Sequence, residues 1–444
     1  MKADLETLFN RLADALFEAL SDSERLALSL SGEASQFIRI NGARVRQTGR
    51  VDDSRLTLSL IDGERQCSGS ITLSGDEADD REQVLLELQR LRDEVAQLPV
   101  DPYIVEPVGG QSSRSVRHGE LLDEAQAARQ LVEPMRDADL TGIYAAGRIV
   151  RGHANSAGSR HWFETDSYSL DYSLLNPEER MVKATLAGSD WDGEAHAASL
   201  ADSAAKLVLL DRPARRIEPG RYRCFIASAG VSDLLGMFSW HGLGESEMQT
   251  GESAFLRMRQ EGVTLSPLFS LSEDFREGRV PRFNQHGEVS PEYIELIRNG
   301  ELVNTLVSSR TAREYGVDSN QAEEGEYLRS PVMAAGDLPE AEVLQALGTG
   351  VYLSNLHYLN WSDVHGGRIT GMTRYACFWV EDGEIVGPIE NMRFDDSFYH
   401  FFGENLEAVT RERRVNPDVG TYGGRDLGAT VCPGVLLSSF ALTL

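Results

Sequence analysis

The sequence predicts an α+β protein with three parts: an N-terminal module of a helix and a small antiparallel sheet, a middle α/β module, and a mostly antiparallel β C-terminal domain. Its 444 residues are enough for two or three domains with cores of their own. Apolar residues recur at helical spacing near the N-terminus, whereas short alternating runs with turn signals dominate the second half. An aperiodic segment at 99–120 separates the first two parts.

Residues 1–98 make up the predicted N-terminal module. Apolar residues spaced three and four apart predict amphipathic helices from Leu5 to Leu20 and from Asp76 to Leu98. Alternating runs lie between them at 26–30, 37–45, 56–60 and 71–73. Turn signals separate these runs: Ser31-Gly32, Asn41-Gly42, Asp62-Gly63 and Ser74-Gly75. We therefore expect a helix packed on a small antiparallel sheet.

Four arginines lie in this predicted sheet although the protein as a whole is acidic: Arg39, Arg44, Arg46 and Arg50. Guanidinium groups match carboxylate geometry, so these side chains could bind a peptide carboxylate or the acidic rim of a partner. A solvated strand face explains such arginines more often. Both interpretations stay open from the sequence.

Residues 99–120 predict an extended connector, either a domain linker or a functional loop over a cleft, and residues 121–215 predict the middle module. Helices are expected at 121–135 and 194–210, with strands between them. His153, His161 and His196 are separated by turns and a predicted helix rather than by ligand spacings. We expect them at the surface or in supporting positions.

Residues 216–444 form the predicted C-terminal domain. Asn299-Gly300 and Asp382-Gly383 each separate two apolar runs, the pattern of tight β-hairpins. A strand at 221–226 leads into a helix expected from Ser232 to His241. Four residues of that helix share one face, which is expected to point to the interior: Leu234, Leu235, Phe238 and His241.

His241 is the candidate around which a metal site could be built. A lone histidine on an apolar helix face is most often a core residue bonded to a backbone carbonyl. A metal requires several converging ligands, and Glu245 stands four residues further on, the spacing of a shared helix face. Two glycines between them are expected to end the helix and separate the pair. His357 and His365 would add imidazoles, although their spacing is not a local ligand pattern.

A second informative stretch runs from Ser362 to Trp379. It contains glycines that permit tight backbone, and four residues suited to gripping the carboxylate and amides of a peptide: Arg368, Thr370, Thr373 and Arg374. We assign these four as candidate substrate-binding residues. A well-folded turn with surface arginines is the alternative.

The net charge excludes several function classes. The chain carries 43 Lys and Arg against 70 Asp and Glu, a formal charge of −27. Such a field repels nucleic acid and anionic membranes at long range. No apolar run has the length of a membrane span or a signal peptide, and the four cysteines lie far apart without a Cys-x-x-Cys pair. A reduced, cytoplasmic protein without nucleic-acid or membrane partners is expected.

The segment 236–255, together with the N-terminal and middle modules, resembles the TldD/PmbA (TldE) family, whose members were formerly described as modulators of DNA gyrase. In catalytic members the helix reads His-Glu-Ala-Val-Gly-His-Gly-Leu-Glu-Gly and is followed by Ser-Val-Phe. Aligning Ser253-Ala254-Phe255 with that triplet places the second histidine on His241. The first histidine then falls on Gly236 and the glutamate on Met237. Glycine has no side chain to ligate a metal, and methionine cannot transfer a proton.

Catalytic members also resemble one another in a cysteine ligand near the C-terminus. The comparable stretch here is Tyr422-Gly423-Gly424, and Cys432 stands about one short strand later, so the ligand role is not carried over to it. The resemblance therefore implies the non-catalytic, TldE/PmbA-like side of the family. No catalytic residue is assigned with confidence, and His241 and Glu245 remain weak metal candidates.

The resemblance implies a subunit that forms a peptide-processing chamber with a TldD-like zinc metallopeptidase. In that hypothesis zinc belongs to the partner, no cofactor belongs to this chain, and the substrates are unfolded or small peptides. A dimer is expected, either with a TldD-like subunit or with a second copy. Two alternatives stay open: an active homodimeric metal-dependent peptidase with a rearranged site around His241, and a stand-alone peptide-binding module.

Overall fold

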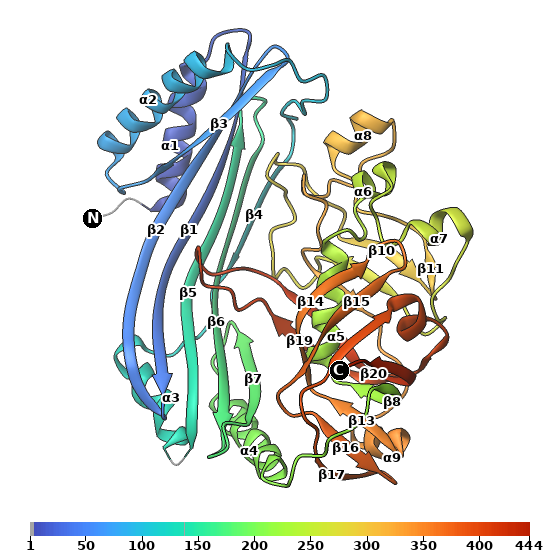
Figure 1. The fold of residues 1–444 in the computed structure, drawn as a ribbon. Helices are drawn as coiled ribbons and strands as arrows, with labels where there is room; N and C mark the ends of the chain where they lie inside the picture. Colours follow the sequence, from blue (N-terminus) through green and yellow to red (C-terminus); the bar gives the residue numbers. More distant parts are fainter. Residues whose placement is uncertain (1–3, 137) are drawn as a thin grey trace.

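The computed structural model describes residues 4–136 and 138–444 and shows two lobes side by side (Figure 1). The elements of the N-terminal lobe are α1 (Leu5–Glu18), β1 (Glu24–Asn41), β2 (Arg44–Asp62), β3 (Arg65–Thr72), α2 (Glu77–Val95), β4 (Ser112–Arg117), α3 (Glu124–Val132), η1 (Glu133–Met135), β5 (Asp139–Asn155), β6 (Arg160–Leu175), β7 (Met181–Gly188) and α4 (Gly193–Leu210). The four helices predicted in this half are confirmed, with ends that shift by a few residues.

The strands of the N-terminal lobe form one long curved sheet in the order β3-β2-β1-β5-β6-β4, with β7 also paired to β6 (Figure 1). The strands predicted for the middle module therefore do not make a sheet of their own. They extend the first sheet because β5 covers the free edge of β1 over residues 27–41. The expected connector at 99–120 also contributes a strand, since β4 pairs in parallel with β6.

The expected turn at Ser31-Gly32 is wrong, because both residues lie inside β1 and pair with β2 and β5. The glycine serves close packing instead: a Cβ at Gly32 would stand 3.1 Å from the Leu5 side chain of α1. The turn at Asn41-Gly42 is confirmed, with Gly42 at φ +57° and Ala43 at φ +51°. The two strands that this turn joins, β1 and β2, are therefore much longer than the short runs predicted.

Leucines on alternate positions of β1 and β2 build the first core. They lie under α1 and α2, where they contact Leu8, Phe9, Leu12 and Leu88. The buried leucines of the two strands are Leu26, Leu28, Leu30, Leu56, Leu58 and Leu60. Because side chains alternate across a strand, the intervening residues point to the opposite face of the sheet.

The C-terminal lobe begins at residue 220. Its elements are β8 (Gly220–Ile226), α5 (Ser228–Gly236), η2 (Met237–Ser239), α6 (Glu245–Thr250), α7 (Leu256–Glu261), β9 (Leu271–Asp274), β10 (Tyr293–Arg298), β11 (Glu301–Leu302), α8 (Ser309–Tyr315), β12 (Pro331–Met333), η3 (Glu340–Glu342), α9 (Val343–Leu347), β13 (Gly350–Leu353), β14 (Asn355–Asp363), β15 (Arg368–Arg374), β16 (Phe378–Glu381), β17 (Glu384–Pro388), β18 (Arg393–Ser397), the π-helical turn η4 (His400–Glu404), β19 (Leu406–Pro417) and β20 (Ala429–Leu442).

The sheet of the C-terminal lobe is mixed rather than purely antiparallel. Its main path is β11-β10-β9-β12-β20-β8-β13-β16-β17. The pairs β12–β20 and β8–β13 are parallel, whereas the hairpins β10–β11 and β16–β17 are antiparallel. Both predicted hairpin turns are confirmed, because Asn299-Gly300 and Asp382-Gly383 all have positive φ angles. Helix α5 packs in the core of this lobe through Leu234 and Leu235, which are fully buried.

Candidate functional site

The two lobes enclose a cavity of about 660 Å³, which we call the interlobe cleft. Strands β1, β2 and β5 form its floor, and the opposite wall consists of segments 280–285, 323–329, Asp418 and 426–427 of the C-terminal lobe. Ser239, in the turn after α5, also lines it. This volume falls in the range of roughly 300–1,000 Å³ typical of ligand pockets. The cleft is therefore the principal candidate site.

Two rows of side chains cross the floor of the cleft. The first row is Arg55, Ser31 and Arg151, because Ser31 pairs with Arg55 on one side and with Arg151 on the other. The second row is Thr57, Ser29 and His153, paired in the same way. All six lie opposite the leucine face of the sheet and line the cleft.

His153 continues the second row into the neighbouring strand, where it pairs with His161. Both rings are buried, as is the ring of His196, so of the two expected placements the surface one is wrong and a supporting position remains. The C-terminal lobe covers His153 and His161, since the His161 ring stacks on Phe283 at a centroid distance of 5.1 Å. Burial, reinforced by the nearby His161 and His286, lowers the pKa of His153 to about 3. Neither ring nitrogen of His153 has a hydrogen-bond partner among the described residues.

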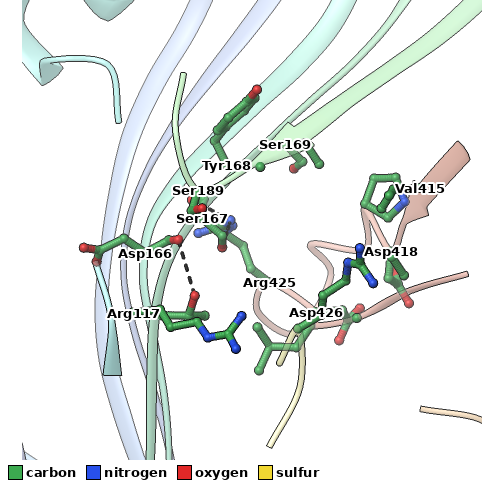
Figure 2. A pocket seen from close by; sticks show the side chains of 18 of the residues that line it. Arg117, Asp166, Ser167, Tyr168, Ser169, Ser189, Val415, Asp418, Arg425 and Asp426 are labelled. Carbon is green, nitrogen blue, oxygen red and sulfur yellow. Dashed lines mark hydrogen bonds between the residues drawn. The ribbon is translucent and has the colours of Figure 1, made fainter. Parts of the chain in front are cut away.

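The loop between β19 and β20 forms part of the cleft wall and joins the two lobes. Figure 2 shows Arg425 of this loop reaching toward Ser167 of β6. Its guanidinium donates to the carbonyl and hydroxyl oxygens of Ser167 at 2.9 and 2.8 Å and to the carbonyl of Gly147 at 3.2 Å. Arg425 lines a second cavity of about 390 Å³, which shares Asp418 and Asp426 with the interlobe cleft. The loop thus separates two cavities and holds the lobes together.

Arg151 and Asp426 give the cleft opposite charges on its two sides. Arg151 donates one hydrogen bond, from Nη1 to the carbonyl of Val150 at 2.9 Å. Burial lowers the pKa of Arg151, while Asp426 and Glu33 act in the opposite direction. Burial also raises the pKa of Asp426, and the neighbouring carboxylate of Asp418 adds to that shift. The floor is therefore cationic and the wall acidic.

The helix around the degenerate motif differs from the prediction. It begins at Ser228 rather than Ser232 and passes through a 3-10 turn that ends at Ser239. Leu234, Leu235 and Phe238 are fully buried as expected. His241 is outside the helix at φ +52°, so its placement on the same face is wrong.

The helix ends at Trp240, whose backbone is extended, and the carboxylate of Glu247 binds the turn that follows. It accepts hydrogen bonds from the backbone N–H groups of His241 and Gly242 at 2.9 and 2.8 Å. These N–H groups are therefore turned away from the carbonyls that would continue the helix. The Nδ1 atom of His241 also lies 3.7 Å from Glu247, and the exposed fraction of the side chain is 32%.

The two altered motif positions occupy different surroundings. Gly236 is the last residue of α5, and no atom lies within 4 Å of the place where a Cβ would stand. Met237 is buried in the core of the C-terminal lobe. Cys432 is at the opposite end of α5, with its Sγ 3.2 Å from the carbonyl of Ser228. Eight residues of helix separate Ser228 from Gly236, which is about 12 Å at ~1.5 Å per residue.

Glu245, the second weak metal candidate, is engaged in an ion pair. Its carboxylate accepts hydrogen bonds from Arg259 at 2.8 and 2.6 Å and from Thr305 and Gln249. Burial alone would raise the pKa of Glu245, but these donors hold it below its ordinary value. The sequence pairing of His241 with Glu245 does not occur, because Glu247 faces the imidazole.

The residues present do not fit the zinc site that catalytic relatives use. Within residues 4–136 and 138–444, no three His, Cys, Asp or Glu side chains come together in a way that could hold a metal. The combination of His241 with His357 and His365 is therefore not formed. Burial raises the pKa of Cys432 to about 12, and its thiol donates to the carbonyl of Ser228 at the start of α5.

The four candidate substrate-binding residues lie together on β15 but not around one cavity. Arg368 pairs with Asp395 at 2.6 Å, and the hydroxyl of Thr370 donates to the carbonyl of Phe394. Thr373 is buried and accepts from the N–H of Met392, and the Arg374 guanidinium lies over the ring of Tyr375. None of the four lines the interlobe cleft.

The arginines singled out on the N-terminal sheet are exposed at the far end of the β1–β2 hairpin. Arg50 pairs with Glu124 of α3. The arginines that line the cleft, Arg55 and Arg151, are different ones that the sequence did not single out. The sequence did contain a signal for the cleft floor. Leu28 and Leu30 alternate with Ser29 and Ser31, so burial of the leucines assigns the two serines to the opposite face of the sheet.

The C-terminal lobe supplies the comparison that decides the family. Residues 219–444 match the model of the PmbA/TldA metallopeptidase C-terminal domain, which is more than half of the chain. The chain belongs to the PmbA/TldD metallopeptidase family. Comparison with curated proteins gives no match. The expected family is thus confirmed.

Solved structures with the same fold extend the PmbA/TldD likeness over both lobes. TldE from Thermococcus kodakarensis has a TM-score of 0.78 at 13% identity, covering 98% of this chain and 100% of that one. A candidate modulator of DNA gyrase from Bacteroides thetaiotaomicron has a TM-score of 0.77 at 16% identity, with 100% of each chain covered. One from Thermotoga maritima has a TM-score of 0.75 at 14% identity, covering 99% and 100%. At these identities the likeness shows a shared fold.

Among the described residues, no helix combines the length and the apolar composition needed to cross a bilayer.

Proposed function

We propose that this chain is a TldE/PmbA-like subunit that lacks a complete zinc site of its own and forms a peptide-processing chamber with a TldD-like zinc metallopeptidase. The carrying observation is the geometry around α5. Met237 is packed in the core, His241 has left the helix, and Cys432 is at the other helix end. Hydrolysis by zinc requires an ordered metal, a polarised water and a proton acceptor in one place.

The interlobe cleft supports the peptide part of the proposal. Its floor offers hydroxyl and guanidinium groups, and its wall offers the apolar side chains of Val280, Phe283 and Leu328. Pockets of mixed character, with a few directed polar groups among apolar ones, suit peptides. In this arrangement the chain binds and presents the substrate, and the partner cleaves it.

An exposed strand edge supports the partner part of the proposal. Residues 44–54 of β2 pair with β1 on one side, while β3 pairs with β2 over Arg55–Asp62. Side chains along residues 44–53 are exposed on both faces. Unpaired edges of this kind are commonly covered by another chain. We therefore expect a dimer, with a TldD-like protein or with a second copy.

The deciding experiment measures cleavage of an unfolded polypeptide, such as reduced and alkylated casein, by three samples. The samples are this chain alone, a TldD-like protein from the same cell alone, and the two mixed. Metal-dependent cleavage by the mixture that exceeds the sum of both single samples is the expected result. Analytical ultracentrifugation of the mixture should show a complex.

Activity of this chain by itself would contradict the proposal. If the chain alone cleaves casein and a chelator stops it, the homodimeric peptidase becomes the better hypothesis. If the mixture behaves as the sum of its parts and no complex forms, the stand-alone peptide-binding module remains.

A further inference from the structure

Among the described residues, neither arginine on the floor of the interlobe cleft has an ion pair within 4 Å, although the charges of Asp426 and Glu33 act on Arg151. Arg55 lines the cleft and is exposed, and no hydrogen bond or ion pair of its side chain to another described residue is found. Arg151 has its bond to the Val150 carbonyl and no ion pair within 4 Å in the described part of the chain. By contrast, Arg329 across the cleft pairs with Glu323 at 3.2 Å.

The register of the sheet places these two arginines on either side of one hydroxyl. Arg55, Ser31 and Arg151 are direct neighbours on three adjacent strands. Strands are spaced ~4.8 Å apart, so the two arginine Cα atoms are about 10 Å apart. Arginine side chains are long enough to converge over a group bound between them. The row therefore offers two guanidinium groups and a hydroxyl as hydrogen-bond donors to one bound group.

We propose that the Arg55–Ser31–Arg151 row binds a carboxylate of a peptide held in the interlobe cleft. This inference rests on the proposed function for the peptide and adds the group by which the peptide is anchored. Guanidinium groups donate paired hydrogen bonds to carboxylates, and partial burial of Arg151 strengthens such bonds. The C-terminal carboxylate of a short peptide is the source that we favour.

The opposite wall argues against a polyanion as the occupant. Asp418 and Asp426 line the same cleft, and the net charge of the chain is −27. These carboxylates would repel repeated phosphates more strongly than a single carboxylate, which carries only one negative charge. The acidic wall also suits the amide N–H groups or the positive end of the same peptide. The cleft thus matches a peptide that enters with its carboxylate toward the sheet.

The test is equilibrium binding to the full chain without a partner, measured by fluorescence anisotropy. Three pentapeptides with an uncharged N-terminal coumarin label are compared: pentaalanine with a free C-terminus, pentaalanine amide, and an amide with glutamate at the third position. The free acid is expected to bind about 10- to 100-fold more tightly than pentaalanine amide, as charge-assisted hydrogen bonds predict. Tight binding of the glutamate amide would assign the row to acidic side chains rather than to C-termini.

The variants Arg55→Gln and Arg151→Gln are expected to remove this preference for the free acid. The matched control is Arg46→Gln, which makes the same charge change on β2 outside the cleft. Circular dichroism melting checks that each variant is folded. If Arg151→Gln fails to fold, Arg55→Gln and the acid-amide comparison in the unchanged chain decide the matter.

Equal binding of the acid and both amides would overturn the inference. A preference for the free acid that survives in the folded Arg55→Gln and Arg151→Gln variants would do so too, as would an absence of binding at millimolar protein concentration. These outcomes are separate from the casein experiment. Cleavage by the mixture without carboxylate preference would retain the proposed function and remove the carboxylate site. Carboxylate binding that depends on Arg151, without any cleavage by the mixture, would retain the carboxylate site and remove the proposed function.

Discussion

Arg425 donates to both the hydroxyl and the carbonyl oxygen of Ser167, so one side chain of the C-terminal lobe is fixed to the sheet of the N-terminal lobe. The same guanidinium also donates hydrogen bonds to the hydroxyl of Ser35 and the carbonyl of Gly147. The backbone N–H of Arg425 donates to the carboxylate of Glu33. The side chain is only 6% exposed. The loop that carries Arg425 also supplies Asp418 and Asp426 to the wall of the interlobe cleft.

Arg425→Met is expected to lower the stability of the chain. The change leaves several buried oxygen acceptors without a donor, at a cost of about 3 kcal/mol in the free energy of unfolding. Urea unfolding followed by tryptophan fluorescence measures it. The control is Arg44→Met on the exposed part of β2, which should change stability by less than about 0.5 kcal/mol. Equal effects of the two substitutions would contradict a docking role for Arg425.

Because the pKa of His153 is lowered, we expect the folded chain to lose stability in acid. Its pKa is about 3 in the folded chain against an ordinary value of 6.5, so the unfolded chain binds a proton that the folded chain rejects. Stability from this group is present above about pH 6.5 and is lost as the pH falls toward 3. His153 alone contributes a decrease in the free energy of unfolding of up to about 1.4 kcal/mol for each pH unit in this range.

Denaturant unfolding at pH 7, 6 and 5 checks this dependence. His153→Gln should flatten the decline in stability between pH 6.5 and 5. His365→Gln is the control, because His365 is exposed on the turn after β14. A profile for His153→Gln that parallels the unchanged chain would show that the ring is protonated, or solvated, in the folded state.

Zinc content is a direct test of the degenerate motif. Protein purified without chelator is expected to contain far less than one zinc per chain, because Gly236 offers no ligand and Cys432 is a buried thiol about 12 Å along α5. Atomic absorption or plasma mass spectrometry measures this. Near-stoichiometric zinc that disappears in His241→Ala would mean that His241 belongs to a metal site in the assembled protein.

Restoring the two motif residues is not expected to create a peptidase. Gly236→His has space for its side chain, but Met237→Glu places a carboxylate in the apolar core of the C-terminal lobe. We expect the double variant to be less stable by about 2 kcal/mol or more and to cleave no casein. Gly236→Ala, which adds only a methyl group in open space, should be stabilising by about 0.5 kcal/mol. Chelator-sensitive cleavage by the double variant would contradict this account.

Periodicity and turn chemistry by themselves determined much of the local structure. The apolar spacing from Leu5 to Leu20 and from Asp76 to Leu98 predicted α1 and α2, and Asn299-Gly300 predicted its hairpin turn. These signals are local, because a helix stripe or a turn with positive φ depends on residues within a few positions of one another. The sequence also determined the family, because residues 219–444 match the model of its C-terminal domain.

Tertiary structure alone decided where long strands continue and which side chains meet. Ser31-Gly32 has the composition of a turn, yet pairing with two neighbours keeps it extended and lets α1 pack closely over Gly32. His241 lies outside its helix, where Glu247, six residues away, accepts its N–H group. Arg55 and Arg151 are nearly a hundred positions apart in the chain and meet across Ser31 through strand register. Register depends on which strands pair, and that depends on the burial of whole faces rather than on any local pattern.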